Sequence, residues 1–144
     1  MKEKLKKSFK KVSKQIKKIV PMLAAVLLLL GLFKTYITEE LIKKVFVGNI
    51  YTDPLLGGVL GSISAGNPIE SYVIGGELLN HGVSLFAVTA FIITWVTVGS
   101  VQFPMESETL GRKFAIKRNV SSFLLALLVS ADTVITVNFL GVAP

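Results

Sequence analysis

Asp132 is the one charged residue in the apolar stretch Val120–Leu140, and it lies near the middle of those twenty-one residues. A carboxylate at the centre of a lipid bilayer costs about 2.5–3.5 kcal/mol on insertion scales, so we expect Asp132 to face a polar interior, a partner or a bound solute. Such a group is typical of proton coupling or solute contact. The alternative is a structural carboxyl group hydrogen-bonded to Ser130, Thr133 or a neighbouring helix.

A second set of polar residues lies between two short apolar segments, at Ser64-Ala65-Gly66-Asn67. Each segment begins with an Asx–Pro pair, Asp53–Pro54 or Asn67–Pro68, which is suited to cap and start a helix. Each predicted helix has about ten to twelve residues and a length of roughly 15–18 Å, about half a bilayer. The pattern predicts a re-entrant hairpin over residues 54–80 with its tip at residues 64–67.

The hairpin tip has the chemistry of a binding site. The second helix would point its free N–H groups and the positive end of its dipole into the membrane interior, where they favour an anion or a polar solute. The predicted substrate- or ion-binding residues surround these donors or lie on the last span: Ser62, Ser64, Gly66, Asn67 and Asp132. The alternative is a packed kink with a purely structural role.

Three further residues are secondary candidates for the site. Glu70 follows Asn67 by three residues, so the two complete a capping box at the start of the second helix. Glu77 lies two turns further along the same face, and we expect it near the outer surface. Trp95 lies in the middle of an apolar stretch rather than at an interface, which indicates packing against protein or lining of a cavity.

Small residues recur at every fourth position in the first arm of the hairpin. The two series are Gly57, Gly61, Ala65 and Gly58, Ser62, Gly66. This spacing lets helix backbones approach closely in lipid, so it predicts tight packing against a neighbouring helix. It does not by itself indicate transport.

The composition excludes several classes of function. The 144 residues contain no cysteine and a single histidine, His81, so neither thiol chemistry nor a metal site is expected. The sequence has no phosphate-binding loop and no nucleophile–base pair, so we predict neither a cofactor nor an enzyme. The net charge of +7 does not indicate nucleic acid, because nine of the sixteen Lys and Arg residues lie within the first eighteen residues.

The elements that must position these residues begin with a basic arm, residues 1–19. Its apolar residues, from Leu5 to Ile19, are spaced by four, three, four and three positions and so share one helical face. The pattern predicts an amphipathic helix in the membrane interface, bound to anionic headgroups of the cytoplasmic leaflet. The alternatives are a disordered tail and a signal peptide. Pro21 is expected to mark the bend into the membrane.

Three stretches are suited to span a membrane, namely residues 20–37, 83–103 and 120–140. The loop 105–119 carries four basic residues and is predicted on the cytoplasmic side, as is the lysine arm. Residues 39–82 must then begin and end on the outer side.

Three arrangements are open to that middle segment. It forms a re-entrant hairpin, an outer domain, or one long span from Leu41, and Lys43, Lys44 and Asp53 make the last of these costly. The hairpin is preferred. We therefore predict an all-α, multi-pass protein of the inner membrane, with an interfacial helix (1–19) and a membrane domain (20–144) of about three spanning helices and the hairpin.

Three motifs follow one another in the stretch GGVLGSISAGNPIESYVIGGELLNHGVSLFAVTAFIITWVTVGSVQFPMESETLGRKFAIKRN: a glycine- and serine-rich hairpin, a span that begins HGVSLFAVTAF, and the loop LGRKFAIKR. In this order they resemble one half of the permeases related to YraQ and to the organoarsenical exporter ArsP, over about Leu55–Leu128. Full-length relatives carry two such halves, so the resemblance implies a half-size permease that acts as a homodimer or higher homo-oligomer. The tip SAGNP lacks the cysteines of the arsenical exporters, so their thiol chemistry is not expected.

The sequence thus predicts a half-size permease that moves a small polar or anionic solute bound at the hairpin tip. Its basic residues lie mostly on one predicted side, thirteen of sixteen, which favours parallel rather than antiparallel copies. The alternative is a non-transporting membrane scaffold or accessory subunit that recruits partners through the lysine arm.

Overall fold

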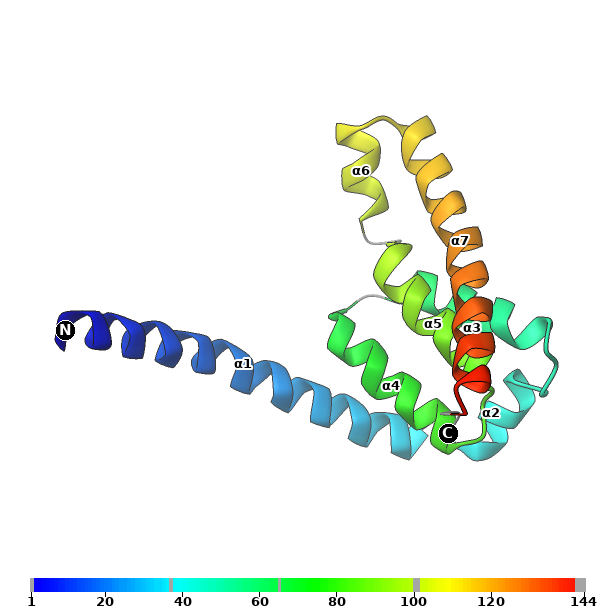
Figure 1. Cartoon of the computed structure of the whole chain (residues 1–144), viewed down its shortest axis with the longest axis horizontal. Helices are drawn as coiled ribbons and strands as arrows, with labels where there is room; N and C mark the ends of the chain where they lie inside the picture. Colours follow the sequence, from blue (N-terminus) through cyan, green and yellow to red (C-terminus); the bar gives the residue numbers. More distant parts are fainter. Residues whose placement is uncertain (1, 37, 65, 100–101, 142–144) are drawn as a thin grey trace. The chain divides into compact units, whose positions relative to one another are not determined.

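The computed structural model describes the backbone of residues 2–36, 38–64, 66–99 and 102–141. Side chains are described from residue 40 onward within these ranges and, before it, at residues 8, 10–17, 20, 21, 24, 25, 28, 31, 32, 35, 36 and 38. The described chain forms α-helices and contains no strand, which confirms the predicted all-α class (Figure 1). The helices are α1 (Lys2–Tyr36), α2 (Glu39–Val45), α3 (Thr52–Ile63), α4 (Pro68–Asn80), α5 (Leu85–Thr97), α6 (Phe103–Thr109) and α7 (Arg112–Phe139).

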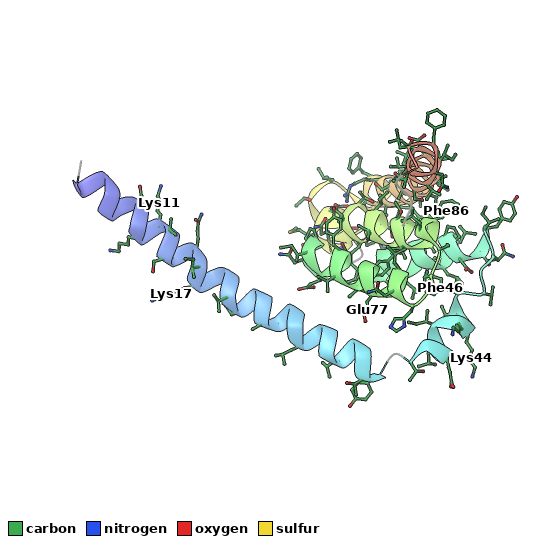
Figure 2. The ribbon with its side chains drawn as sticks, turned by 60° about the horizontal axis from the view of Figure 1, so that its bottom comes forward. Lys11, Lys17, Lys44, Phe46, Glu77 and Phe86 are labelled. Atoms are coloured by element: carbon green, nitrogen blue, oxygen red, sulfur yellow. The ribbon has the colours of Figure 1, made fainter. Side chains whose placement is uncertain are left out.

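Helix α1 belongs to one compact unit, Met1–Thr38, and the other helices form a second unit, Glu39–Pro144. The helix continues through Pro21, so no helix end marks the expected change from interfacial helix to span at this residue, and the division into these two parts stays a prediction. Proline removes one backbone hydrogen bond, and the good helix formers on both sides sustain the remaining ones. Lys11 and Lys17 are among its exposed residues (Figure 2). Many side chains of the predicted first span, 20–37, lie outside the described residues, and that span stays a prediction.

Helix α5 lies at the centre of the second unit and packs against α3, α4 and α7. Its buried residues form much of the core: Ala87, Val88, Ala90, Phe91 and Thr94. A Cβ built at Gly57 of α3 would collide with the carbonyl oxygen of Ala87. One built at Gly61 would collide with the Phe91 carbonyl and the Thr94 hydroxyl. The close helix packing predicted from these two glycines is confirmed, while Ala65 lies outside the described residues.

Helix α5 is shorter than the span predicted over 83–103. It ends at Thr97, and Pro104, which was expected to end the span, lies in the first turn of α6 instead. Its 13 residues extend about 20 Å, whereas the hydrocarbon layer is about 30 Å thick. Val98 leaves the helical conformation beside Gly99, a residue with low helix propensity. The prediction of one continuous helix over this stretch is therefore wrong.

Helix α7 confirms the helix predicted over 120–140 and extends it by about two turns into the predicted loop 105–119. Most of the rest of that loop is helix α6. Among the residues that the structure describes, α7 is the one helix long and apolar enough to cross a membrane, and 11% of its most apolar part is buried within the chain. These properties support association with a membrane.

Helices α3 and α4 correspond to the two arms of the predicted hairpin. Helix α4 begins at the Asn67–Pro68 pair, as predicted. Helix α3 begins one residue before Asp53, and Asp53 does not cap it, so that part of the prediction is wrong. The Asp53 carboxylate is 1% exposed and accepts the backbone N–H groups of Gly48 at 2.8 Å and Val47 at 3.3 Å. It therefore ties the loop that follows α2 to the start of α3.

Candidate functional site

The break between α3 and α4 uses its hydroxyl groups locally. Ser62 donates its side-chain hydroxyl to the Val59 carbonyl at 2.8 Å, and Ser64 donates to the Leu60 carbonyl at 2.7 Å. Ser64 is the last residue held by α3, since its backbone N–H still bonds to Leu60 and Gly61. Both predicted site serines thus lie at the break, but their hydroxyl hydrogens point back into α3.

The predicted capping box of Asn67 and Glu70 is present and closes the start of α4. The Asn67 Oδ1 accepts the Ile69 N–H at 3.0 Å, and Glu70 Oε2 accepts the Asn67 N–H at 3.2 Å. The Glu70 N–H bonds to the Asn67 carbonyl at 2.9 Å, and Pro68 has no N–H. The first amide donors of α4 therefore have acceptors within the chain, and a carboxylate already lies at the positive end of the helix. This arrangement removes the basis for an anion at the tip.

Gly66 brings the break into contact with α5. A Cβ built at Gly66 would overlap the Glu70 carboxylate and lie 3.1 Å from Cζ2 of Trp95, so only glycine leaves room for both side chains. Trp95 also packs edge-on against Phe91, with ring centroids 5.3 Å apart, which confirms its expected packing against protein. The fold thus gathers Gly66, Glu70 and Trp95 into one place, and Asn67 joins them through the capping box.

The indole Nε1 of Trp95 is buried and has no hydrogen-bond partner among the residues that the structure describes. It lies two bonds from the ring carbon that faces Gly66, so this donor belongs to the same corner of the fold. Leaving a buried donor unsatisfied costs about 1–3 kcal/mol. Tryptophan N–H groups normally find a partner when buried, which makes this atom a candidate contact for a bound water or solute.

Asp132 does not join the break within one chain. Its side chain is exposed, and none of the hydrogen bonds among the described residues involves it. The part of α7 that follows it, at Val134 and Asn138, lies beside Leu85 and Phe86 at the start of α5. The break lies beside Trp95, nine residues and about 14 Å further along α5. The expected composite site of hairpin tip and Asp132 is therefore not formed by a single copy.

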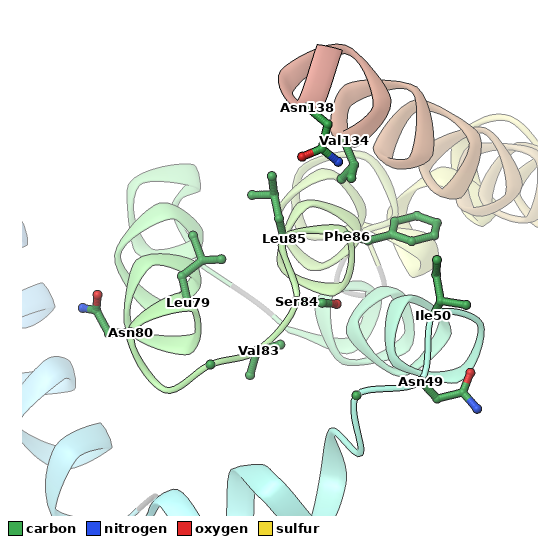
Figure 3. A pocket seen from close by; sticks show the side chains of 12 residues that line it. Asn49, Ile50, Leu79, Asn80, Val83, Ser84, Leu85, Phe86, Val134 and Asn138 are labelled. Atoms are coloured by element: carbon green, nitrogen blue, oxygen red, sulfur yellow. The ribbon is translucent and has the colours of Figure 1, made fainter. Parts of the chain in front are cut away.

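A pocket lies at the end of the unit away from the break, with a volume of about 620 Å³ (Figure 3). Volumes of this order are typical of small-molecule sites. None of its lining residues is charged, and the side chains of Asn49 and Asn80 point away from it in Figure 3. It is lined by Gly48, Asn49, Ile50, Leu79, Asn80, Gly82, Val83, Ser84, Leu85, Phe86, Val134 and Asn138. No sequence pattern predicted this pocket, since its residues come from three segments that are far apart in the chain.

Glu77 lies near the same end of the unit as this pocket, at the last turn of α4. Its Oε1 is 3.8 Å from the His81 Nε2, four residues further along the chain. The Glu77 side chain is mostly buried, with 13% of it exposed. It lies about two turns of α4 beyond Glu70, so it does not share a location with Glu70 and the break.

A charged cluster joins α6 to α7 next to the end of α5. Arg118 forms an ion pair with Glu106, and its Nη2 donates to the Thr97 carbonyl at 3.3 Å. Asn119 donates to the other Glu106 oxygen at 3.4 Å and to its own helix at 2.9 Å. The contact between Arg118 and Thr97 crosses 21 residues, and no sequence pattern predicted it. The cluster satisfies a carbonyl that the end of α5 leaves free.

Among the described residues, no group of three or more His, Cys, Asp or Glu side chains is arranged to hold a metal ion. No family model, curated protein or solved structure matches the chain. The resemblance to the YraQ- and ArsP-related permeases therefore stays a prediction.

Proposed function

We propose that the chain is a half-size membrane permease that passes a small polar solute along the break at residues 64–67 and acts as a homo-oligomer. The observation that carries the proposal is the buried Trp95 Nε1, which has no acceptor among the described residues and lies where α3 ends and α4 begins. Interrupted helices at membrane depth are tolerated where the backbone is satisfied by protein or lines a cavity. The capping box supplies that satisfaction, and Trp95 remains available to a solute.

The helix directions support a re-entrant hairpin. Helix α3 runs alongside α5, with Gly57 near Ala87 and Gly61 near Phe91, and α7 runs the opposite way. If the basic start of α7 is cytoplasmic, α3 and α5 run inward, and the break lies about 20 Å from their outer ends. That depth is inside a hydrocarbon layer of about 30 Å. We accordingly propose about three spans, including residues 20–37, in the inner membrane with a cytoplasmic N-terminus.

The groups at the break favour a neutral polar solute over an anion. Trp95 offers a donor, Glu70 presents a carboxylate with a free acceptor oxygen, and the amide donors of α4 are already used. A solute with both a hydrogen-bond acceptor and a donor fits this pair of groups, whereas an anion meets the Glu70 charge. The proposed solute class is therefore small, uncharged and polar.

Stopped-flow shrinkage of vesicles that contain the purified chain tests this proposal, with urea and glycerol as neutral probes and formate as the anion. We expect permeation of a neutral probe above that of empty vesicles, and a reduction of about five- to tenfold in Trp95→Phe, because one hydrogen bond to the solute is lost. Tyr72→Phe is the matched control, since it removes a hydroxyl from an exposed aromatic residue of the same unit. Equal permeation by Trp95→Phe and the unsubstituted chain would contradict the proposal.

A second candidate is a non-transporting membrane scaffold. It is favoured by the closed capping box and by the position of the 620 Å³ pocket at the other end of α4 and α5. This candidate predicts vesicles as tight as protein-free ones to urea, glycerol and formate alike, with the chain fully inserted. That outcome would contradict the permease proposal and favour the scaffold function.

A further inference from the structure

One face of α7 carries an unbroken stripe of exposed residues. The stripe consists of Ser121, Leu125, Leu128, Asp132, Ile135 and Phe139, all exposed and spaced by four, three, four, three and four positions. We propose that this outer stripe is the contact surface for a second copy of the chain, lying parallel to the first, with the two Asp132 carboxyl groups hydrogen-bonded to each other.

The exposure of the outer stripe is large and one-sided. Leu128 is 66% exposed, Ile135 66% and Phe139 90%, whereas Ala126 and Ser130 on the other side of α7 are buried against the unit. The inner side also receives α3, since Phe123 and Leu127 lie against Gly58. Helix α7 is therefore fixed on one side and leaves the outer stripe unpartnered.

The spacing of the outer stripe matches another helix. An alternation of four and three residues is the 3.5-residue repeat by which two helices pack along a seam, and a single polar residue in such a seam fixes the register and the number of chains. Asp132 is that residue. A parallel second copy presents the same seam and places its own Asp132 at the same depth.

The charges of the second unit leave Asp132 with no basic partner. No Lys or Arg occurs between Lys44 and Arg112 or after Arg118, and Arg118 is already paired with Glu106. In lipid an isolated carboxylate is costly, so it requires a partner group. Two carboxyl groups satisfy each other when at least one is protonated, because its O–H then donates to an oxygen of the other.

The distribution of basic residues supports the parallel arrangement. Thirteen of sixteen lie in the arm or in the segment 112–118, which are predicted on one side of the membrane. A chain with one orientation pairs through an axis along the membrane normal.

The absence of cysteine from the chain allows a direct test by single cysteine substitutions and oxidative cross-linking of the full chain in membranes. We expect strong cross-linking of Leu128→Cys and Ile135→Cys. Val129→Cys is the matched control, because Val129 is 51% exposed but lies about a quarter of a turn from the outer stripe. Ala126→Cys, on the buried side, is expected to remain monomeric. Equal cross-linking at Leu128 and Val129 would overturn the proposal.

Substitution of Asp132 in the Leu128→Cys background tests the hydrogen bond. We expect Asp132→Leu to weaken self-association roughly tenfold, since it removes the interhelical hydrogen bond, and Asp132→Asn to keep most of it. Unchanged cross-linking in Asp132→Leu would overturn the assigned role. A double variant, Leu128→Cys with Lys34→Cys, tests whether another segment covers the outer stripe. Preferential cross-linking between these two positions would also overturn the proposal, because the segment around Lys34 would then contact the stripe in place of a second copy. None of these readouts requires transport, so the interface can stand even if the proposed permease activity fails.

Discussion

The break beside Trp95 and the outer stripe of α7 differ in whether their polar side chains find hydrogen-bond partners within the chain. At the break, Asn67 and Glu70 satisfy each other, and Ser62 and Ser64 donate to the preceding turn of their own helix. On α7, Asp132 is exposed on an apolar helix, outside the hydrogen bonds that the described residues form. At the break the capping box and the serine hydroxyls are satisfied within one chain, and the Trp95 Nε1 is the group left for a solute. For Asp132 we propose that the partner is a second copy of the chain. A polar residue in a membrane helix is therefore informative about partners only when its own chain leaves it unsatisfied.

The largest expected effect is at the α3–α5 contact that supports the break. Gly61→Val would place two methyl groups where the Phe91 carbonyl and the Thr94 hydroxyl already lie, and neither backbone can move away without separating the helices. We expect a loss of about 3 kcal/mol in the free energy of unfolding, measured by SDS titration in detergent micelles. Gly76→Ala is the control, since nothing lies within 4 Å of its Cβ, and it should be neutral or slightly stabilising. Similar losses in both variants would show that the contact is not tight.

The next effect concerns Asp53, the buried carboxylate that the sequence assigned to a helix cap. Asp53→Ala leaves the Val47 and Gly48 N–H groups without their acceptor, so we expect a loss of about 2 kcal/mol in the same titration. Asp53→Asn keeps one carbonyl oxygen and should lose less. Amide hydrogen exchange should speed up at residues 47 and 48 in Asp53→Ala. Unchanged exchange there would mean that the carboxylate does not hold the loop.

A smaller effect is expected at the capping box itself. Asn67→Ala removes one acceptor for the start of α4, and caps of this kind contribute about 1 kcal/mol. Asn67→Ser retains a capping oxygen and serves as the matched control. A loss in Asn67→Ala that Asn67→Ser does not recover would point to a contact other than the cap.

The elements that the sequence predicted well have signals confined to a few neighbouring residues. The capping box needs only Asn67, Pro68 and Glu70, and the close approach of α3 needs only the four-residue repeat of Gly57 and Gly61. The end of α5 had no such signal, because residues 98–103 carry no charge and the uncharged stretch continues past the end of the helix. The Thr97 carbonyl is satisfied by Arg118, 21 residues away.

The sequence could not predict, for a different reason, that Asp132 lies on the exposed side of α7. Both sides of α7 are apolar, so periodicity does not indicate which side packs against α3 and α5. The sequence also could not predict that the Trp95 Nε1 lacks an acceptor among the described residues, because this depends on every neighbouring helix. Residues that act across helices thus require the fold, whereas residues that act within one turn do not.

The smallest expected effect sharpens the contrast between the two regions. Asp132→Leu should change the free energy of unfolding of the isolated monomer by no more than about 0.5 kcal/mol, because the side chain is exposed and outside the hydrogen bonds of its unit. The measurement is an SDS titration at a protein concentration low enough to keep the chain monomeric. A loss as large as that of Asn67→Ala would mean that Asp132 is satisfied within its own chain. In that case the argument for a second copy at the outer stripe would fail, because the Asp132 carboxyl group would already have a hydrogen-bond partner in its own chain.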